Sequence, residues 1–432
     1  MSADLTVDFL SQTETTSSDP TALVESVRRG GETLRELGVD QIISILDAFS
    51  ARLLDRDLDI HAKYPGSGIP YIASWCRRAR LEPLIDDALV SRAFLDRFIA
   101  SPNRPDRAYM AFPRGLAVHW MAGNVPTLGF LSLIQGLLTK NANIIKIASQ
   151  SDRLLADLLG VLADVKTPDG LLGRTIAEAV SVVRYDHERK DLGAVFSQAA
   201  ETRIMWGGDD SVAQIKALPM QTDVQDIVYP AKTSLIVISR ETLALNDLEP
   251  VTRKIAQDIA VFDQKACASP HTIFLETDDD ADIERFAGAL RQSMERAAKT
   301  LVSAVPSGQS VSAIMNLRAQ YDILHKAWYS EGVQYTILSD DKMQLGPAIG
   351  NRTVYLRKVG ALEAIAALIT PKVQSVGLSV PEPRMDSVTT ALGAAGVQRF
   401  TPLGAMTHFD SPWDGFFAAQ LLVRWASRPA GI

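Results

Sequence analysis

The sequence predicts an α/β protein with two mainly parallel β-sheets and a helical N-terminal region. Its 432 residues suit two or three domains. Between about residues 114 and 240, short apolar strands alternate with helices, which indicates right-handed βαβ crossovers. A second α/β set begins near residue 234 and ends near 380. We therefore expect domains at 1–235 and 236–400, and a tail, 401–432, packed back on the body.

The composition is that of an ordinary globular protein, with 47% apolar and 22% charged residues. The net charge is −7, and no Lys/Arg cluster suggests a nucleic acid or an anionic membrane surface as partner. Two distant cysteines give neither a disulfide framework nor zinc-ligand spacing. Reduced thiols and a cytoplasmic location are expected.

Two segments could suggest targeting or a membrane. The first twenty residues are acidic and rich in Ser and Thr, unlike a signal peptide, and are expected to form a loosely held arm. The uncharged run from Gly115 to Thr139 is long enough to span a bilayer. Because His119, Asn124 and Gln135 interrupt it, we expect a buried strand, a turn and a buried helix, and no membrane span.

Apolar spacing gives the order of the elements. Residues 20 to 105 are expected to be mostly helical. In the first domain we expect strands at 116–121, 143–148, 179–185 and 202–208, and helices at 124–141, with Pro126 in the first turn, at 149–165 and at 191–201. In the second we expect a strand at 234–241, a helix at 250–265 and a strand at 271–276. The stretch 411–427 is expected to be a short amphipathic helix. Its aromatic residues could wall a substrate tunnel or pack in the core: Trp413, Phe416, Phe417 and Trp425.

Common catalytic and cofactor motifs are absent from the sequence. There is no G-x-G-x-x-G after a strand, no P-loop, no G-x-S-x-G and no H-E-x-x-H. The six histidines lack metal-ligand spacing. These absences argue against P-loop enzymes, α/β-hydrolases and metallohydrolases, and no metal site is expected.

Cys267, in DQKACASPH (263–271), is either a nucleophile or a small buried apolar residue. It follows the predicted end of a helix, where the dipole disfavours an anion, so Lys265 or a cofactor's positive ring would have to compensate. Cys76 lies in a helical pattern and is not expected to have a role.

Four stretches, in this order and spacing, carry a resemblance: HWMAGNVP (119–126), NIIKIASQSDR (143–153), RIMWGGDDSV (203–212) and DQKACASPH. They resemble the aldehyde dehydrogenase superfamily and, within it, the LuxC-like acyl-CoA reductases. QSVGLS (374–379) and LVRW (422–425) are also similar to that branch. The resemblance covers residue 110 to the end. It implies an aldehyde-dehydrogenase-like fold, with an NAD(P)-binding domain in 1–235, a catalytic domain in 236–400 and a homo-oligomer.

The resemblance also implies two catalytic residues. The cysteine of the family, here Cys267, attacks the acyl carbonyl and forms a thioester. The matching Asn124 donates its side-chain N–H to the oxyanion, together with the backbone N–H of the cysteine. From the sequence alone, a cap of the following helix is the more usual role for Asn124, and the two roles are compatible.

Cofactor residues follow from the same match. Lys146 matches a lysine that holds the adenosine ribose, although alone it could be a solvated strand-end residue. NAD-preferring members commonly carry a Glu three residues later; Ser149 stands there, with Arg153 beyond it. This favours a 2′-phosphate, and hence NADPH, with NADH as the alternative. The turns between strand and helix add further residues: Met121, Ala122, Trp206, Gly207 and Gly208. The pair Asp209–Asp210 departs from a phosphate site, and a Gly-Gly pair is often only a turn.

One departure concerns hydrolysis. Hydrolytic aldehyde dehydrogenases carry a Glu that activates water, but Val228 or Tyr229 stands at the matching place, and no acid lies between Asp226 and Glu241. Without a general base, attack by water is slow. The expected function is therefore an NADPH-dependent acyl-CoA reductase, an enzyme that takes a small-molecule acyl-CoA, releases coenzyme A and makes an aldehyde. The alternatives are a reductase of an acyl-carrier-protein thioester or an acyl phosphate on the same scaffold, and a catalytically silent, partner-binding subunit.

Overall fold

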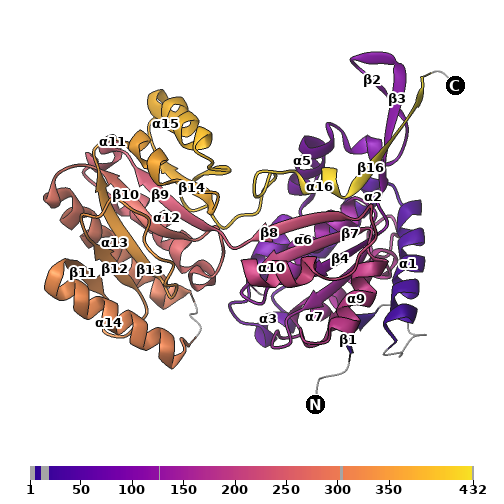
Figure 1. The fold of residues 1–432 in the computed structure, drawn as a ribbon, viewed down its shortest axis with the longest axis horizontal. Coiled ribbons are helices and arrows are strands. Elements are labelled where there is room, and N and C mark those ends of the chain that lie inside the picture. Colours follow the sequence, from indigo (N-terminus) through magenta and orange to yellow (C-terminus); the bar gives the residue numbers. More distant parts are fainter. Residues whose placement is uncertain (1–4, 11–18, 126, 302–304, 431–432) are drawn as a thin grey trace. The chain divides into compact units, whose positions relative to one another are not determined.

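The computed structural model describes residues 5–10, 19–125, 127–301 and 305–430. The chain divides into two units (Figure 1), of which the first is Met1–Pro230 with Phe409–Ile432 and the second is Ala231–His408. The C-terminal tail from Phe409 onward therefore belongs to the first unit.

The first unit contains a six-stranded sheet in the order β1-β6-β5-β4-β7-β8. Its strands are β1 (Thr6–Leu10), β4 (Leu116–Trp120), β5 (Ala142–Ile147), β6 (Val180–Arg184), β7 (Thr202–Gly207) and β8 (Gln225–Pro230). All neighbours are parallel except β1 and β6. Since every residue of β4 is buried, this strand forms the centre of the unit.

Helices pack on both faces of that sheet. Alternate residues of β4, such as Leu116 and Val118, contact α1 (Pro20–Glu36) and α9 (Lys190–Ala199), whereas His119 contacts Ser132 of α6 (Leu128–Leu138) on the other face. The remaining elements of the described part are α2 (Val39–Leu53), α3 (Ile60–Lys63), α4 (Ile69–Trp75), α5 (Arg78–Leu89), η1 (Arg92–Leu95), α7 (Leu154–Ala163), α8 (Gly173–Ala177), α10 (Asp209–Lys216) and α16 (Ala418–Leu421).

The strand order places the functional edge of this sheet. β4 comes first among the parallel strands; β5 and β6 add on one side of it, and β7 and β8 on the other. In open α/β sheets, ligands bind at the carboxyl ends of the strands where the order reverses. We therefore expect a ligand site beyond Trp120.

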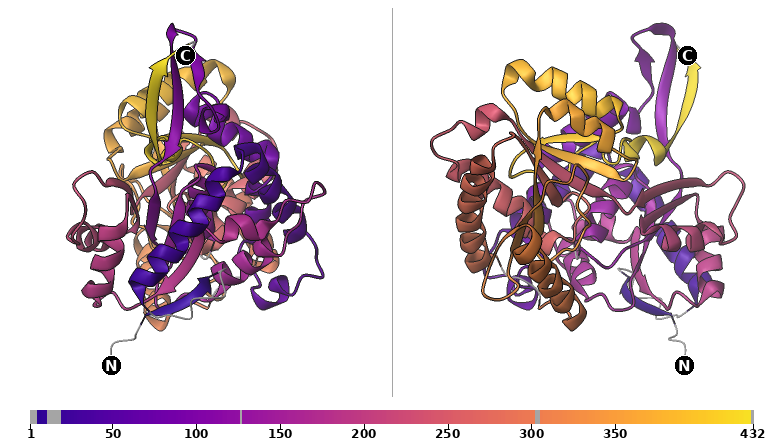
Figure 2. Two further views of the ribbon diagram at one scale, coloured as in Figure 1. Left: turned by 90° about the vertical axis from the view of Figure 1, so that its right-hand side faces the viewer. Right: turned by 60° about the vertical axis from the view of Figure 1, so that its left-hand side comes forward.

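A small antiparallel sheet extends from the first unit. Its order is β16 (Val423–Pro429), β3 (Arg104–Pro113) and β2 (Ile99–Ser101). Figure 2 shows yellow β16 running beside the purple β2–β3 hairpin.

The second unit has a seven-stranded sheet in the order β11-β12-β13-β10-β9-β14-β15. Its strands are β9 (Thr233–Ile238), β10 (Pro270–Glu276), β11 (Lys326–Tyr329), β12 (Thr336–Ser339), β13 (Thr353–Val359), β14 (Val373–Ser379) and β15 (Arg399–Pro402). Only the β11–β12 pair is antiparallel. Its helices are α11 (Arg240–Leu243), α12 (Glu249–Ala260), η2 (Val261–Gln264), α13 (Asp280–Thr300), α14 (Gly308–Leu324), η3 (Leu362–Leu368) and α15 (Glu382–Ala394).

The N-terminal prediction was wrong in part. Thr6–Leu10 is not a loose arm but strand β1, paired antiparallel with β6. Arg184 and Arg153 both bind the buried Asp8 of β1, so a tertiary ion pair holds a segment whose composition suggested disorder. Residues 1–4 and 11–18 lie outside the description.

Four predicted helices are shorter than expected. The helix expected at 149–165 is α7, which begins at Leu154 and ends at Ala163. The helix expected at 250–265 ends at Ala260, and the backbone becomes left-handed from Phe262 to Gln264. The helix expected at 411–427 is reduced to α16, because the chain then pairs as β16 with β3. The helix expected from residue 124 begins at Leu128, and Pro126 lies outside the described residues.

The apolar run at 115–139 forms β4, a loop and α6, as expected, and α6 is buried on all sides. Within the described residues, no helix is both long and apolar enough to cross a membrane. Nor does this part of the chain contain a group of three His, Cys, Asp or Glu side chains that could hold a metal ion.

Candidate active site

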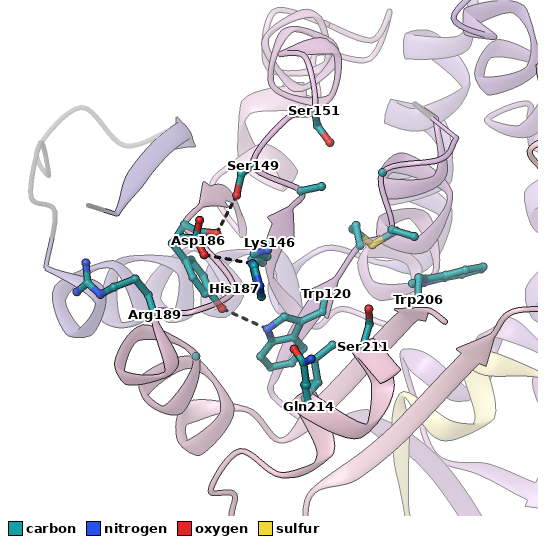
Figure 3. A pocket seen from close by; sticks show the side chains of 18 of the residues that line it. Trp120, Lys146, Ser149, Ser151, Asp186, His187, Arg189, Trp206, Ser211 and Gln214 are labelled. Atoms are coloured by element: carbon teal, nitrogen blue, oxygen red, sulfur yellow. Dashed lines mark hydrogen bonds and ion pairs between the residues drawn. The ribbon is translucent and has the colours of Figure 1, made fainter. Parts of the chain in front are cut away.

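A pocket of about 890 Å³ lies in the first unit, at the carboxyl ends of β4, β5, β6 and β7 (Figure 3). Its walls come from the turns that follow these four strands. Most of the predicted cofactor residues line it: Met121, Ala122, Lys146, Ser149, Trp206, Gly207 and Gly208. The sheet therefore gathers residues up to about 90 positions apart in the chain, because parallel strands end at one edge.

Arg153 is the exception. It is not among the lining residues, and its guanidinium donates to the Asp8 carboxylate at 3.0 Å and to the Asp8 carbonyl at 3.1 Å. Arg153 is the N-cap residue of α7 and is directed to β1. Arg153 therefore does not lie with Lys146 and Ser149, the residues with which the sequence analysis grouped it.

Lys146, on β5, is the cation at the centre of the pocket (Figure 3). Its ammonium group lies 5.2 Å from the centroid of the Tyr185 ring. Burial lowers the pKa of Lys146, and the charge of Asp186 opposes this shift. A partly desolvated ammonium facing an open pocket attracts an anion or ribose hydroxyls.

The turn at Ser149–Ser151 is held from behind by Arg184. Its guanidinium donates to the carbonyls of Ser149 at 3.1 Å and Ser151 at 2.6 Å, and to the Asp8 carboxylate at 2.8 Å. The Ser149 hydroxyl donates to the Tyr185 carbonyl at 3.3 Å. Ser149 therefore lies in the pocket wall on a backbone that these hydrogen bonds hold in place.

A buried hydrogen-bond chain sets the orientation of Trp206. The Trp206 indole N–H donates to Ser132 at 3.1 Å, and Ser132 lies 2.8 Å from Nδ1 of His119. The other ring nitrogen of His119 lies 3.1 Å from the Asn143 amide oxygen. Burial lowers the pKa of His119 to about 4, so this histidine is neutral and acts as a structural link. On its other side, Trp206 stacks on Tyr229 with ring centroids 3.7 Å apart.

Among the pocket residues that the sequence analysis missed are three basic side chains: His187, Arg189 and Lys190. They follow β6 and lead into α9, within the stretch YDHERK. The guanidinium of Arg189 binds the Asp191 carboxylate with two N–H groups, at 2.9 and 2.7 Å. Their position after a predicted parallel strand was visible in the sequence and could have identified them.

Asn124 lies in the exposed loop between β4 and α6. The N-cap of α6 is Thr127, so the alternative in which Asn124 caps this helix is wrong.

α10 begins after Gly208, with Asp209 and Asp210 in its first turn, and acids there stabilise the helix end.

Cys267 lies on a turn just before β10 in the second unit, and its side chain is partly exposed. Its carbonyl accepts the hydroxyl of Ser234 at 2.8 Å. Cys76 ends α4, is fully buried, and burial raises the pKa of its thiol far above the ordinary value. Of the two cysteines, Cys267 alone is accessible to reagents.

At the position matching the hydrolytic Glu, the structure has no proton acceptor for neutral pH. Val228 is apolar, and Tyr229 is buried against Trp206 and Phe416. Burial raises the pKa of Tyr229, so its phenol keeps its proton. Neither side chain can activate a water molecule.

Comparisons with known proteins agree with this architecture. A family model described as acyl-CoA reductase (LuxC) matches residues 34–425. A long-chain acyl-protein thioester reductase from Photorhabdus laumondii is 27% identical over 398 residues, with 86% of this chain and 76% of the relative covered. A protein of the same name from Vibrio harveyi is 25% identical over 415 residues, with 91% and 83% covered.

Among solved structures, an indole-3-acetaldehyde dehydrogenase from P. syringae superposes with a TM-score of 0.67 at 13% identity, covering 96% of this chain and 89% of that one. This likeness shows the fold. The matches confirm the fold class and the family that the four motifs predicted. The chain belongs to the LuxC family of acyl-CoA reductases and is an oxidoreductase with the aldehyde dehydrogenase fold.

Proposed function

We propose that this protein reduces an acyl thioester to an aldehyde with NADPH, through an acyl-enzyme on Cys267. The observation that carries the proposal is the pocket beyond β4, where the residues matched to nucleotide binding come together. Its volume of about 890 Å³ lies in the range of ligand sites. Two indoles, two lysines and open glycine backbone suit a dinucleotide, so the residues present fit this cofactor.

In this proposal, the Cys267 thiolate attacks the thioester carbonyl. A bond forms between Sγ and carbon, and the original C–S bond breaks and releases the thiol. Asn124 donates an N–H to the oxyanion, as its motif implies. Bound NADPH supplies a hydride. The thiohemiacetal oxyanion formed on Cys267 re-forms its C=O bond as its C–S bond breaks, which releases the aldehyde and restores the cysteine thiolate.

NADPH rather than NADH is proposed for a physical reason. No carboxylate stands at Ser149, and Lys146, His187 and Lys190 add cationic or hydrogen-bonding groups to the pocket. A 2′-phosphate gains from such groups and would be repelled by a glutamate. Arg153 is left out of this assignment, since Asp8 holds it.

The acyl donor is proposed to be coenzyme A. An acyl-protein donor is the second candidate, because the curated relatives are named as acyl-protein thioester reductases. The side chains at positions 228 and 229 support transfer to hydride or thiol over transfer to water. Steady-state rates with acyl-CoA, acyl-carrier protein and acyl phosphate of equal chain length separate the donors.

Cys267→Ala is expected to abolish NADPH-dependent thioester reduction, because the acyl-enzyme cannot form. Asn124→Ala is expected to lower kcat by about 10²- to 10³-fold, the usual loss for one oxyanion donor. NADPH oxidation with an acyl-CoA is the measurement, and Cys76→Ala serves as the control. Activity of more than a few per cent in Cys267→Ala would overturn the mechanism.

A further inference from the structure

The segment that leads into Cys267 has an unusual backbone. Phe262, Asp263 and Gln264 follow one another with φ values of 55°, 50° and 62°. Residues with a Cβ seldom adopt this left-handed conformation, and a run of three persists only where surrounding contacts impose it. The contacts that impose it here surround the cysteine loop.

A second left-handed turn lies beside the first. Gly350, Asn351 and Arg352 have φ values of 77°, 48° and 57° and lead into β13. Because β10 and β13 are neighbouring parallel strands, the two turns lie at the same amino-terminal edge of the sheet.

A buried ion pair joins the two turns. The Asp263 carboxylate accepts from Nε of Arg352 at 2.9 Å and lies 2.8 Å from its Nη2. The side chains of Arg352 and Asp263 are 1% and 9% exposed. The same guanidinium donates to the Leu301 carbonyl at 3.1 Å. A buried charge pair of this kind is geometrically demanding, since the planar guanidinium fork permits few arrangements.

Gln264 closes the loop around the cysteine. Its amide nitrogen donates to the carbonyl of Pro270 at 2.7 Å and to that of Thr353 at 2.8 Å. Its amide oxygen accepts the Thr353 backbone N–H at 2.8 Å. A single side chain therefore ties both ends of the segment 264–270 to β13, with Cys267 between them.

A third contact reaches Cys267 directly from β9. The Ser234 hydroxyl donates to the Cys267 carbonyl at 2.8 Å and accepts the Ser375 backbone N–H at 3.3 Å. The cysteine backbone is thus held between three strands of the sheet, β9, β10 and β13.

We propose that Asp263, Gln264, Arg352 and Ser234 are positioning residues that hold Cys267 in the geometry needed for attack on the acyl carbonyl. The inference rests on the proposed role of Cys267 as nucleophile. Misplacement of a reacting group by about 1 Å can cost about 100-fold in rate. If these contacts were lost, the thiol of Cys267 would remain, but it would occupy many positions instead of one.

The test measures acyl transfer to Cys267 in the full chain without reduced cofactor. Decanoyl-CoA is the probe, and intact-protein mass spectrometry follows the acyl-enzyme with time. Arg352→Lys, which keeps the charge and loses the fork, and Gln264→Glu are expected to slow acylation by about 10- to 100-fold. NADPH affinity, which depends on the pocket of the first unit, is expected to stay unchanged.

Asp340→Asn is the matched control, since it breaks another buried ion pair of the second unit. Asp340 lies 3.1 Å from Nε of Arg357, and it follows the carboxyl end of β12, at the opposite edge of the sheet from Cys267. It is expected to lower thermal stability without slowing acylation. If Arg352→Lys or Gln264→Glu fails to fold, Ser234→Ala, which removes one hydroxyl, is expected to slow acylation by about 3- to 10-fold.

Folded variants that acylate at the wild-type rate would overturn the inference. So would an Asp340→Asn variant that slows acylation as much as Arg352→Lys, because loss of any buried pair would then suffice. A wild-type protein that is never acylated at Cys267 would instead contradict the proposed function.

Discussion

Ser149 illustrates how one side chain can set cofactor preference. It lines the pocket on a turn whose backbone Arg184 holds through the carbonyls of Ser149 and Ser151. A longer acidic side chain at this position would extend toward the space near Lys146. The proposed preference for a phosphorylated ribose would therefore depend on the absence of an acid at this position as well as on the cations present.

Ser149→Glu is expected to lower kcat/KM for NADPH at least about 10-fold relative to NADH, because the new carboxylate repels a 2′-phosphate and accepts ribose hydroxyls. Steady-state kinetics with both cofactors measure the ratio. Ser149→Ala, which adds no charge, should keep the wild-type preference. An unchanged ratio in Ser149→Glu would exclude this side chain as the determinant.

Asp258, on α12, links that helix to the loop after β15. Its carboxylate accepts the backbone N–H groups of Gly404 at 2.6 Å and Met406 at 3.0 Å. Burial raises the pKa of Asp258 to about 7, although these hydrogen bonds oppose the shift. The folded protein therefore binds this proton more tightly than the unfolded chain, in which the carboxyl has a pKa of about 4.

This shift predicts a pH-dependent stability. Because the folded-state pKa is raised, the stability that Asp258 contributes is full below about pH 4 and is lost as pH rises through about 7. The loss amounts to a few kcal/mol at most. Urea unfolding at pH 5, 6, 7 and 8 should show a decline that is shallower in Asp258→Asn. If the free energy of unfolding fell equally with pH in the wild type and in Asp258→Asn, the raised pKa of Asp258 would be refuted.

At the scale of the element, β1 is a strand that composition did not suggest. It pairs with β6, and its Asp8 side chain is only 3% exposed between Arg153 and Arg184. Arg184 links β1 to the Ser149–Ser151 turn, so an N-terminal strand supports the rim of the pocket.

Arg184→Ala is expected to lower the free energy of unfolding by about 1–3 kcal/mol, because it removes charge-assisted bonds to the buried Asp8 and to two carbonyls. It should also raise KM for NADPH several-fold by releasing the turn. Arg153→Ala, the control, removes a partner that is 55% exposed and should cost less than about 1 kcal/mol. Equal losses in urea unfolding would argue against a special role for Arg184.

Elements with uniform burial followed their sequence patterns closely. α6 is buried on every side, and it forms within the uncharged run that predicted a buried helix, although it begins at Leu128. The helix predicted at 250–265 failed at its end, because apolar spacing continues through Val261 and Phe262 while the Asp263–Arg352 pair imposes a left-handed turn. Periodicity reports local burial and does not report a contact 89 residues away.

At the scale of the whole molecule, the chain contains two units, with the pocket of about 890 Å³ inside the first. The first unit is closed by the tail from Phe409, whose Phe416 packs on Tyr229, the residue under Trp206. The homo-oligomer that the resemblance implies stays a prediction.

Hydrogen–deuterium exchange on the full chain tests where the cofactor binds. Saturating NADPH is expected to protect the turns at 120–123, 146–151, 185–190 and 206–214, which line the pocket, because a ligand that binds only the folded state suppresses local opening. Protection that spares these four turns at saturation would place the cofactor elsewhere.

The sequence by itself determined the α/β class, the alternation of strands and helices between about residues 114 and 240, and the motifs that mark the family, but it did not predict β1 or β16. Strand and helix periodicity is local, so it can be recognised along the chain. The resemblance to the family grouped Lys146, Ser149 and Trp206, and the parallel sheet brings them to one edge. Only the tertiary structure decided the rest. In the folded chain Arg153 binds Asp8, and α12 ends before Cys267. Asp263 also binds Arg352. A buried charge requires a partner, so these outcomes depend on which distant charged residues come together in the interior. The pattern of residues along the chain does not specify those pairs.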